Sequence, residues 1–315
     1  MTIWKMTAGC LCVLVLAALV VGCGGGGKGN ANLAEAIIFM RDTPGGDNEV
    51  WMMDIDGSDP RVVASVVGGD AIQGTLSPDG RKLLYVEHPG GTSSIVVKDL
   101  NTGVTTAVLT DAVNSGNRFA PAWSPDGTQI AYHDDGDRSI HVMNADGTGG
   151  ATITAGATGS GDHTPAWNQN GTKIAYDKGW WGSIAVCNPD GSGEVIVLPE
   201  TTSSYSQPQF LPDGRILAMR DSASQDMVIV NADGTGETNL TPGTDGSDES
   251  SPSVNFHGNK IAFGSTSAGV GQRDCFIGTW TGATLTNLTN LTVADGQMCW
   301  RPKCGVVDVV YFNLP

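Results

Sequence analysis

The chain has 315 residues, of which 44 are glycine, 40% are hydrophobic and only 6% are aromatic. That hydrophobic share is enough for a packed core, and the 16% of charged residues is too low for a typical disordered chain. Lys and Arg number 17 against 33 Asp and Glu, which gives a net charge of −16. Because such an acidic surface repels phosphate backbones, we expect no nucleic-acid partner.

The N-terminal segment has the features of a secretory leader. One lysine precedes an apolar run at residues 8–21, which is short for a membrane span and ends in small residues before Cys23. This ending resembles the lipobox of bacterial lipoproteins, which predicts a signal peptide at 1–22, lipidation of Cys23 and a glycine-rich tether at 23–36. An ordinary signal peptide with an incidental cysteine is the alternative. Glycine rather than aspartate after the cysteine favours the periplasmic side of the outer membrane.

The rest of the chain repeats. A four-residue turn pattern, Ser-Pro-Asp-Gly in its first two copies, recurs at spacings of 47, 44, 43, 44 and 46 residues. Its residue preferences are those of a type I turn that ends in a left-handed glycine. The copies, the last two degraded, begin at Ser77, Ser124, Asn168, Leu211, Asn255 and Arg301. A period near 44 residues predicts a modular array rather than two unrelated domains.

Each repeat unit contains four short predicted strands. An apolar run such as Ile130–Tyr132 follows the first turn, an alternating strand such as Ile140–Met143 comes next, and a second turn and a Thr/Val-rich strand end the unit. One such sheet cannot bury both faces, so the sheets must stack around an axis. We therefore predict an all-β fold, a six-bladed β-propeller of four-stranded antiparallel blades. One bulky residue before each first turn is predicted to plug the gap between blades: Leu76, Trp123, Trp167, Phe210, Val254 and Trp300.

The chain ends are predicted to close the ring. Residues 37–40, 50–54 and 61–67 read as a second, third and fourth strand that lack an innermost partner, and 297–300 reads as a sixth innermost strand. If the strand at 297–300 pairs with the N-terminal strands, no sheet edge is left open. This gives one domain at 37–315, which is expected to be monomeric. Residues 309–312 also look like a strand, so seven blades are the alternative.

The pattern Pro-Ala-Trp-Ser-Pro-Asp-Gly … Ile-Ala-Tyr … Val-Met-Asn-Ala-Asp-Gly-Thr, at 121–148, resembles the TolB-type (WD-repeat-like) β-propeller repeat. The resemblance covers residues 37–312 and implies a fold more than a function. That family includes the periplasmic TolB propeller, which works with a peptidoglycan-associated lipoprotein, propellers that gate prolyl-oligopeptidase-type peptidases, and polysaccharide lyases. The sequence has no Gly-x-Ser-x-Gly elbow, which argues against an autonomous serine hydrolase.

Residues just before each innermost strand are expected to face the axial funnel. Their polar and aromatic mixture suits recognition of a peptide or a sugar, although a funnel entrance is wet and polar in any case. The candidates are Arg118, Phe119, Asp162, His163, Tyr205, Gln207, Glu249 and Gln297. Trp180 and Trp181, at a predicted hairpin tip, form either an exposed patch for a partner or glycan or a contact with the next blade.

Metal and cofactor sites are not predicted. The five histidines, at 88, 133, 141, 163 and 257, do not share one repeat position, so we expect them not to converge. The run Asp134–Asp137 offers carboxylates for a hard cation such as calcium, and a calcium ion in the channel stays open, but a solvated turn is the preferred interpretation.

Four cysteines follow the leader and tether: Cys187, Cys275, Cys299 and Cys304. In an oxidising compartment they permit two disulfides, and Cys299 with Cys304 is the favoured local pair because the two flank a predicted turn.

Two functions fit these observations. The first is a lipid-anchored, non-catalytic scaffold of the cell envelope that binds a protein or cell-wall partner through its funnel face. The second is a propeller enzyme acting on polysaccharide, with Asp162 and His163 as an acid/base pair or a metal at the pore. The scaffold is preferred because enzymes of this type need convergent ligands, and the repeat registers scatter them.

Overall fold

The computed structural model describes residues 33–43, 45–110, 118–156, 161–179, 182–222, 224–242, 249–255, 257–266, 273–281, 285–290 and 300–308. The predicted leader at 1–22 and the predicted tether up to residue 32 lie outside these ranges. Within them the chain forms 24 strands, in six four-stranded antiparallel sheets, and no helix capable of crossing a membrane.

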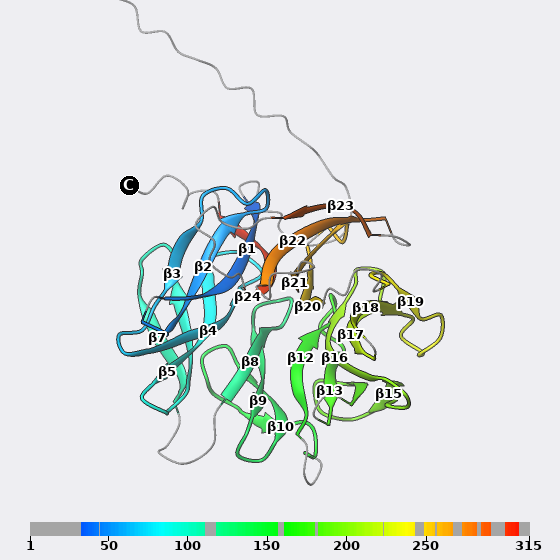
Figure 1. Cartoon of the computed structure of the whole chain (residues 1–315). Helices are drawn as coiled ribbons and strands as arrows, with labels where there is room; N and C mark the ends of the chain where they lie inside the picture. The colour runs from blue at the N-terminus through cyan, green and yellow to red at the C-terminus, as the bar shows by residue number, and fades with distance from the viewer. Residues whose placement is uncertain are drawn as a thin grey trace, which may run out of the picture. The chain divides into compact units, whose positions relative to one another are not determined.

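The six sheets are the blades of the propeller, and we number them in chain order with their strands from the axis outward (Figure 1). Blade 1 contains β24 (Trp300–Asp308), β1 (Leu33–Asp42), β2 (Asn48–Asp54) and β3 (Arg61–Ala64). Blade 2 contains β4 (Gly69–Leu76), β5 (Lys82–Pro89), β6 (Ser94–Asp99) and β7 (Thr105–Thr110). Blade 3 contains β8 (Arg118–Trp123), β9 (Gln129–Asp134), β10 (Ser139–Asn144) and β11 (Ala151–Thr152).

The second half of the chain repeats this order. Blade 4 contains β12 (His163–Trp167), β13 (Ile174–Lys178), β14 (Ser183–Cys187) and β15 (Val195–Leu198). Blade 5 contains β16 (Ser204–Phe210), β17 (Ile216–Asp221), β18 (Gln225–Val230) and β19 (Thr238–Asn239). Blade 6 contains β20 (Glu249–Val254), β21 (Lys260–Thr266), β22 (Arg273–Trp280) and β23 (Leu285–Asn290).

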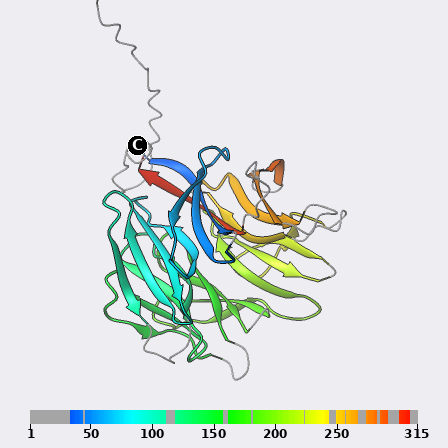
Figure 2. The same cartoon turned by 60° about the vertical axis from the view of Figure 1, so that its left-hand side comes forward.

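The ring closes through blade 1, whose strands come from both ends of the chain. Strand β24 lies antiparallel beside β1, with Leu33 opposite Asp308 and Met40 opposite Trp300, and Figure 2 shows the two strands side by side. This confirms the six-bladed propeller with paired chain ends, and the seven-bladed alternative is wrong. Strand β1 begins four residues before the predicted start at 37, and residues 309–312 lie outside the described ranges.

The innermost strand of blade 1 differs from the prediction. The segment 301–304, expected to be a degraded turn, lies inside β24, and Trp300 is at the start of that strand instead of its end. The register shift in β24 falls opposite Ile38 and Met40, which makes Pro302 equivalent to the proline that follows Ala120 in β8. The last repeat has kept the strand proline and lost the turn proline.

Six hydrophobic clusters hold the blades together, one between each pair of neighbours around the full ring. The cluster between blades 6 and 1, for example, contains Ile37 and Phe39 of β1 with Ala262 of β21. The predicted plugs belong to these clusters: Leu76, Trp123 and Phe210 are buried, and Trp167 and Val254 pack partly buried against them. The side chain of Trp300 lies outside the description.

The second turns of blades 3, 4 and 5 fit closely against the preceding blade. At Gly234 in blade 5 the backbone has φ +83°, and a Cβ atom there would lie 2.5 Å from the carbonyl oxygen of Val197 in blade 4. Gly147 and Gly191 make the same approach to Val108 and Ile153. These turns need glycine both for the left-handed backbone and for the space.

Candidate functional site

A bulge or register shift interrupts each innermost strand, and in blades 2 to 6 the first residue of the bulge has a left-handed backbone. Gln73, Ala120, Thr164, Gln207 and Ser251 have φ between 45° and 57°, and each is followed by glycine in blade 2 or by proline in the others. A non-glycine residue in this region costs about 1–3 kcal/mol, so the surrounding structure must hold it in place. A ring of such residues around the axis marks the channel as the candidate site.

Hydrogen bonds between blades hold these strained residues. The N–H of Ala120 donates to Oε1 of Gln73 at 2.6 Å, and the N–H of Ser251 donates to Oε1 of Gln207 at 2.6 Å. The N–H of Gln207 in turn donates to Oδ1 of Asp177, in the preceding blade, at 2.7 Å. Each contact joins one blade to the next at the narrow part of the ring.

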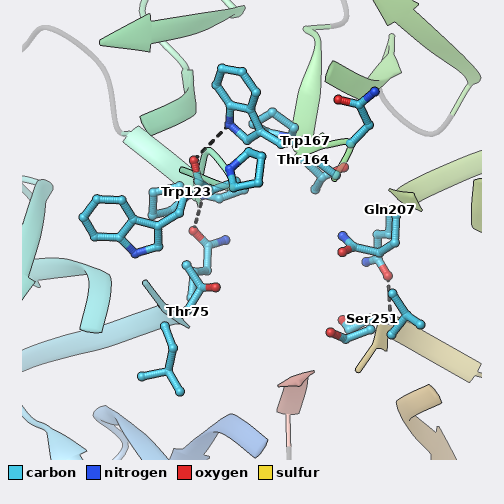
Figure 3. A pocket seen from close by; sticks show the side chains of 18 of the residues that line it. Thr75, Trp123, Thr164, Trp167, Gln207 and Ser251 are labelled. Carbon is cyan, nitrogen blue, oxygen red and sulfur yellow. Dashed lines mark hydrogen bonds between the residues drawn. The ribbon is translucent and has the colours of Figure 1, made fainter. Parts of the chain in front are cut away.

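The channel contains a cavity of about 310 Å³ (Figure 3). Its wall is formed by the bulge residues and by the parts of the innermost strands and turns that follow them. The described lining side chains include Thr75, Pro121, Trp123, Trp167, Gln169, Gln209 and Ser253, and none of them is charged. In a chain of net charge −16, this described part of the lining suits a neutral, hydrogen-bonding occupant.

Two glutamines present amide donors to this channel from opposite sides. Gln73 is in blade 2 and Gln207 is in blade 5, three blades apart in a ring of six. In both, Oε1 accepts a backbone N–H from the next blade, which fixes the carboxamide and leaves Nε2 with its two hydrogens for the cavity. A carbonyl or hydroxyl oxygen is the group that such donors recognise.

Two tryptophans, Trp123 and Trp167, line the channel, and a hydrogen bond fixes the orientation of Trp167. The Nε1–H of Trp167 donates to the carbonyl oxygen of Ala122 at 3.2 Å, across the gap between blades 3 and 4. Figure 3 shows this bond at the cavity wall. The sequence analysis predicted Trp123 and Trp167 as plugs, and the structure gives them a second role because both also line the cavity.

Apart from Gln207, which is itself a bulge residue, the described funnel candidates precede the bulge, whereas the cavity lies at and after it. Among the six candidates whose side chains the structure describes, Gln207 alone lines the cavity. Tyr205 is buried in the cluster between blades 4 and 5, where its hydroxyl donates to Oε2 of Glu237 at 2.9 Å. Glu249 is buried and accepts a hydrogen bond from Oγ of Ser265 at 3.4 Å. The cavity is therefore a second candidate surface, at another level of the innermost strands, and the role of the funnel residues stays a prediction.

Two histidines converge, contrary to the sequence analysis. The rings of His133 and His163, from adjacent blades, lie 3.9 Å apart, and Phe119 stacks on the other side of His133 at 6.5 Å. His133 is fully buried, with Nδ1 2.6 Å from the carbonyl oxygen of Asp162 and Nε2 2.7 Å from Oδ1 of Asp135. Burial and the neighbouring His133 lower the pKa of His163 to about 4.

The pair Asp162 and His163 does not have the geometry of an acid/base pair at a pore. Asp162 is fully buried, burial raises its pKa, and its Oδ1 accepts the N–H of Gly179 at 3.3 Å. Its carboxyl group therefore cannot meet a substrate in the channel without rearrangement. Within the described ranges no three His, Cys, Asp or Glu side chains gather into a metal site.

The carboxylates at 134–137 make hydrogen bonds and contacts within their own loop and its flanking strands. Asp134 accepts the N–H of Gly136 at 2.8 Å, Asp135 contacts His133, and Asp137 contacts Nε2 of His141 at 2.9 Å. These contacts are those of a loop held between two strands.

The cysteines do not form the two disulfides that four of them permit. Cys187 is a buried free thiol, and Cys275 is disulfide-bonded. The predicted pairing of Cys299 with Cys304 stays a prediction, because residue 299 and the side chain of 304 lie outside the described residues. The same holds for Cys23, Trp180, Trp181, Gln297 and the side chain of Arg118.

The comparisons with known proteins place the fold in a family. The family described as TolB beta propeller domain matches residues 32–303, most of the chain. The Tol-Pal system protein TolB of Francisella tularensis subsp. mediasiatica is 26% identical over 225 residues, 69% of this chain and 51% of that protein. A Protein TolB homolog of Chlorobaculum tepidum is 28% identical over 117 residues, 35% of this chain and 25% of that protein. The chain thus spans a quarter to a half of these relatives' length.

The solved structures agree on the fold. TolB from Acinetobacter baumannii has a TM-score of 0.70 at 18% identity, covering 86% of this chain and 66% of that one. An oligogalacturonate lyase in complex with manganese has a TM-score of 0.53 at 16% identity, covering 79% of this chain and 71% of the lyase. The second likeness is weaker and, like the first, concerns fold alone. The family match over residues 32–303 decides the assignment: the chain belongs to the TolB beta propeller domain family.

Proposed function

We propose that this protein is a non-catalytic binding scaffold of the bacterial envelope, anchored through Cys23, whose axial channel receives a protein partner. The observation that carries the proposal is a cavity whose described lining is uncharged and holds two opposed glutamine amides, in a domain of the TolB family. The Tol-Pal name of its relatives supports an envelope protein as the partner. The polysaccharide-enzyme alternative has less support, because Asp162 is buried and the described lining of the cavity offers no cation to an anionic sugar chain.

Gln207→Glu tests the channel. The carboxylate keeps an oxygen for the N–H of Ser251 but replaces the amide donors with acceptors and puts a charge into a neutral cavity. We expect capture of the partner from envelope extracts to fall at least about tenfold, which corresponds to about 1.4 kcal/mol. Asn101→Asp, the same chemical change on an exposed turn of blade 2, is the matched control and should capture normally. Equal capture by both variants would remove the channel from the binding surface.

Cys23→Ser tests the anchor. Serine cannot carry the thioether-linked lipid, so we expect the protein to move from the membrane fraction to the soluble envelope fraction when cells are fractionated. Cys12→Ser, the same change within the leader, should leave the protein in the membrane fraction. A Cys23→Ser protein that stays with the membrane would rule out lipidation at this residue.

A further inference from the structure

A second cavity lies beside the channel, on the face formed by the first turns of blades 3 and 4. It is a groove of about 240 Å³ lined by Ser124, Pro125, Asp126, Gln129, Trp167, Gln169, Asn170 and Gly171. Trp167 lines both the groove and the channel. Sites for drug-sized ligands run from about 300 to 1,000 Å³, so this groove suits a smaller group.

The turn of blade 4 departs from its repeat at this place. In three pairs of neighbouring blades the turn glycine faces the turn proline of the preceding blade: a Cβ at Gly127 would lie 3.6 Å from Pro78, one at Gly171 3.5 Å from Pro125, and one at Gly258 would meet Pro212. Blade 4 has Gln169 in place of that proline, and a Cβ at Gly214 of blade 5 would meet nothing within 4 Å. Glutamine instead of proline at position 169 removes the contact with the turn glycine of blade 5 and adds a side-chain amide to the groove.

The polar groups at the groove are fixed by their own turns. Oδ1 of Asp126 accepts three hydrogen bonds, from Oγ of Ser124 at 2.6 Å and from N and Oγ1 of Thr128 at 3.0 and 2.8 Å. Its Oδ2 is left as an ionised acceptor, since these hydrogen bonds lower the pKa of Asp126. Oδ1 of Asn170 accepts the hydroxyl of Thr172 at 2.6 Å, which leaves Nδ2 as a donor.

An acceptor and a donor beside an indole of fixed orientation match one class of ligand. Adjacent sugar hydroxyls can each donate and accept, and the C–H face of a sugar ring packs on an aromatic face. Grooves for proline-rich peptides are lined by several aromatic residues, and Trp167 is the single aromatic residue among the described lining of this groove. We propose that this groove binds one unit of a neutral saccharide, with the ring on Trp167 and neighbouring hydroxyls on Asp126 and Asn170.

Asn170→Asp is the variant that tests the site. It keeps an oxygen for Thr172 and exchanges the Nδ2 donor for a second carboxylate oxygen, so the turn is retained while the donor is lost. Asn101→Asp serves again as the charge-matched control. Calorimetric titration with chitotetraose, maltotetraose and cellotetraose, and with oligogalacturonate as an anionic comparison, measures binding to the intact protein.

We expect at least one neutral tetrasaccharide to bind with a Kd below about 10 mM, and Asn170→Asp to weaken it about tenfold. Oligogalacturonate should bind more weakly than the neutral sugars, because the protein is strongly acidic. No binding of any neutral tetrasaccharide at that concentration, or equal binding by wild type and Asn170→Asp, would overturn the proposal. So would preference for a proline-rich peptide over the sugars.

Partner capture through the channel is separable from this result. Gln207→Glu lies outside the groove and should leave sugar affinity unchanged, whereas Asn170→Asp should leave partner capture unchanged. Either proposal can therefore fail while the other stands.

Discussion

Gly234→Ala should lower the free energy of unfolding by about 3 kcal/mol. A left-handed backbone costs an alanine about 1–2 kcal/mol, and the new Cβ would lie 2.5 Å from the carbonyl oxygen of Val197 in the preceding blade. Relieving such a contact requires a backbone shift, which costs about 1–3 kcal/mol more. Denaturant titration of both proteins measures the difference.

Gly214→Ala, in the same blade, separates the two causes. Its φ of +87° is as left-handed as the +83° at Gly234, but nothing lies within 4 Å of its Cβ position. We expect only the conformational cost of about 1–2 kcal/mol. If the two variants lost the same stability, the close fit between blades 4 and 5 would not contribute.

The stability of the protein should fall between pH 6.5 and pH 4 partly because of His163. Burial and His133 lower its pKa from 6.5 to about 4. Between these two pH values the unfolded chain therefore binds more protons at this residue than the folded chain does. This contribution is complete above pH 6.5 and is lost as the pH falls through 4. The full shift corresponds to about 3 kcal/mol, and partial exposure of the ring reduces the expectation to about 2 kcal/mol.

His163→Gln measures that contribution, because glutamine does not titrate in this range. The free energies of unfolding of the two proteins, followed in urea from pH 7.5 to pH 4, should converge by about 2 kcal/mol as the pH falls. A constant difference across the range would show that His163 does not titrate with a lowered pKa.

The blade architecture could be read from the sequence because it depends on local chemistry that recurs. The turns at Ser77 and Ser124 fix where strands begin, and the missing innermost strand at the N-terminus requires a partner from the far end. The register of β24 could not be read in this way. Its repeat keeps one of the two prolines that blades 3 and 5 have, and Pro302 was matched to the turn when it belongs to the bulge.

The site was harder to predict because its contacts run sideways between blades. His133 meets His163, and Asp177 meets Gln207, in both cases 30 residues along the chain. Members of each pair occupy different positions of the repeat, so comparing equivalent positions could not bring them together. In both pairs, the second strand of one blade packs beside the bulge region of the innermost strand of the next blade. Comparing the end of each second strand with the next innermost strand, about 30 residues later, would have found both pairs.

The pairing of β1 with β24 has a consequence for synthesis. Strands β1 to β3 leave the ribosome first, yet the strand that covers β1 comes last, after five other blades have been made. Until then Ile37 and Phe39 lie next to an unpaired edge, in a contact that spans almost the whole chain. A nascent molecule is thus most open to misassociation before its synthesis is complete, and pairing of its last strand ends that exposure.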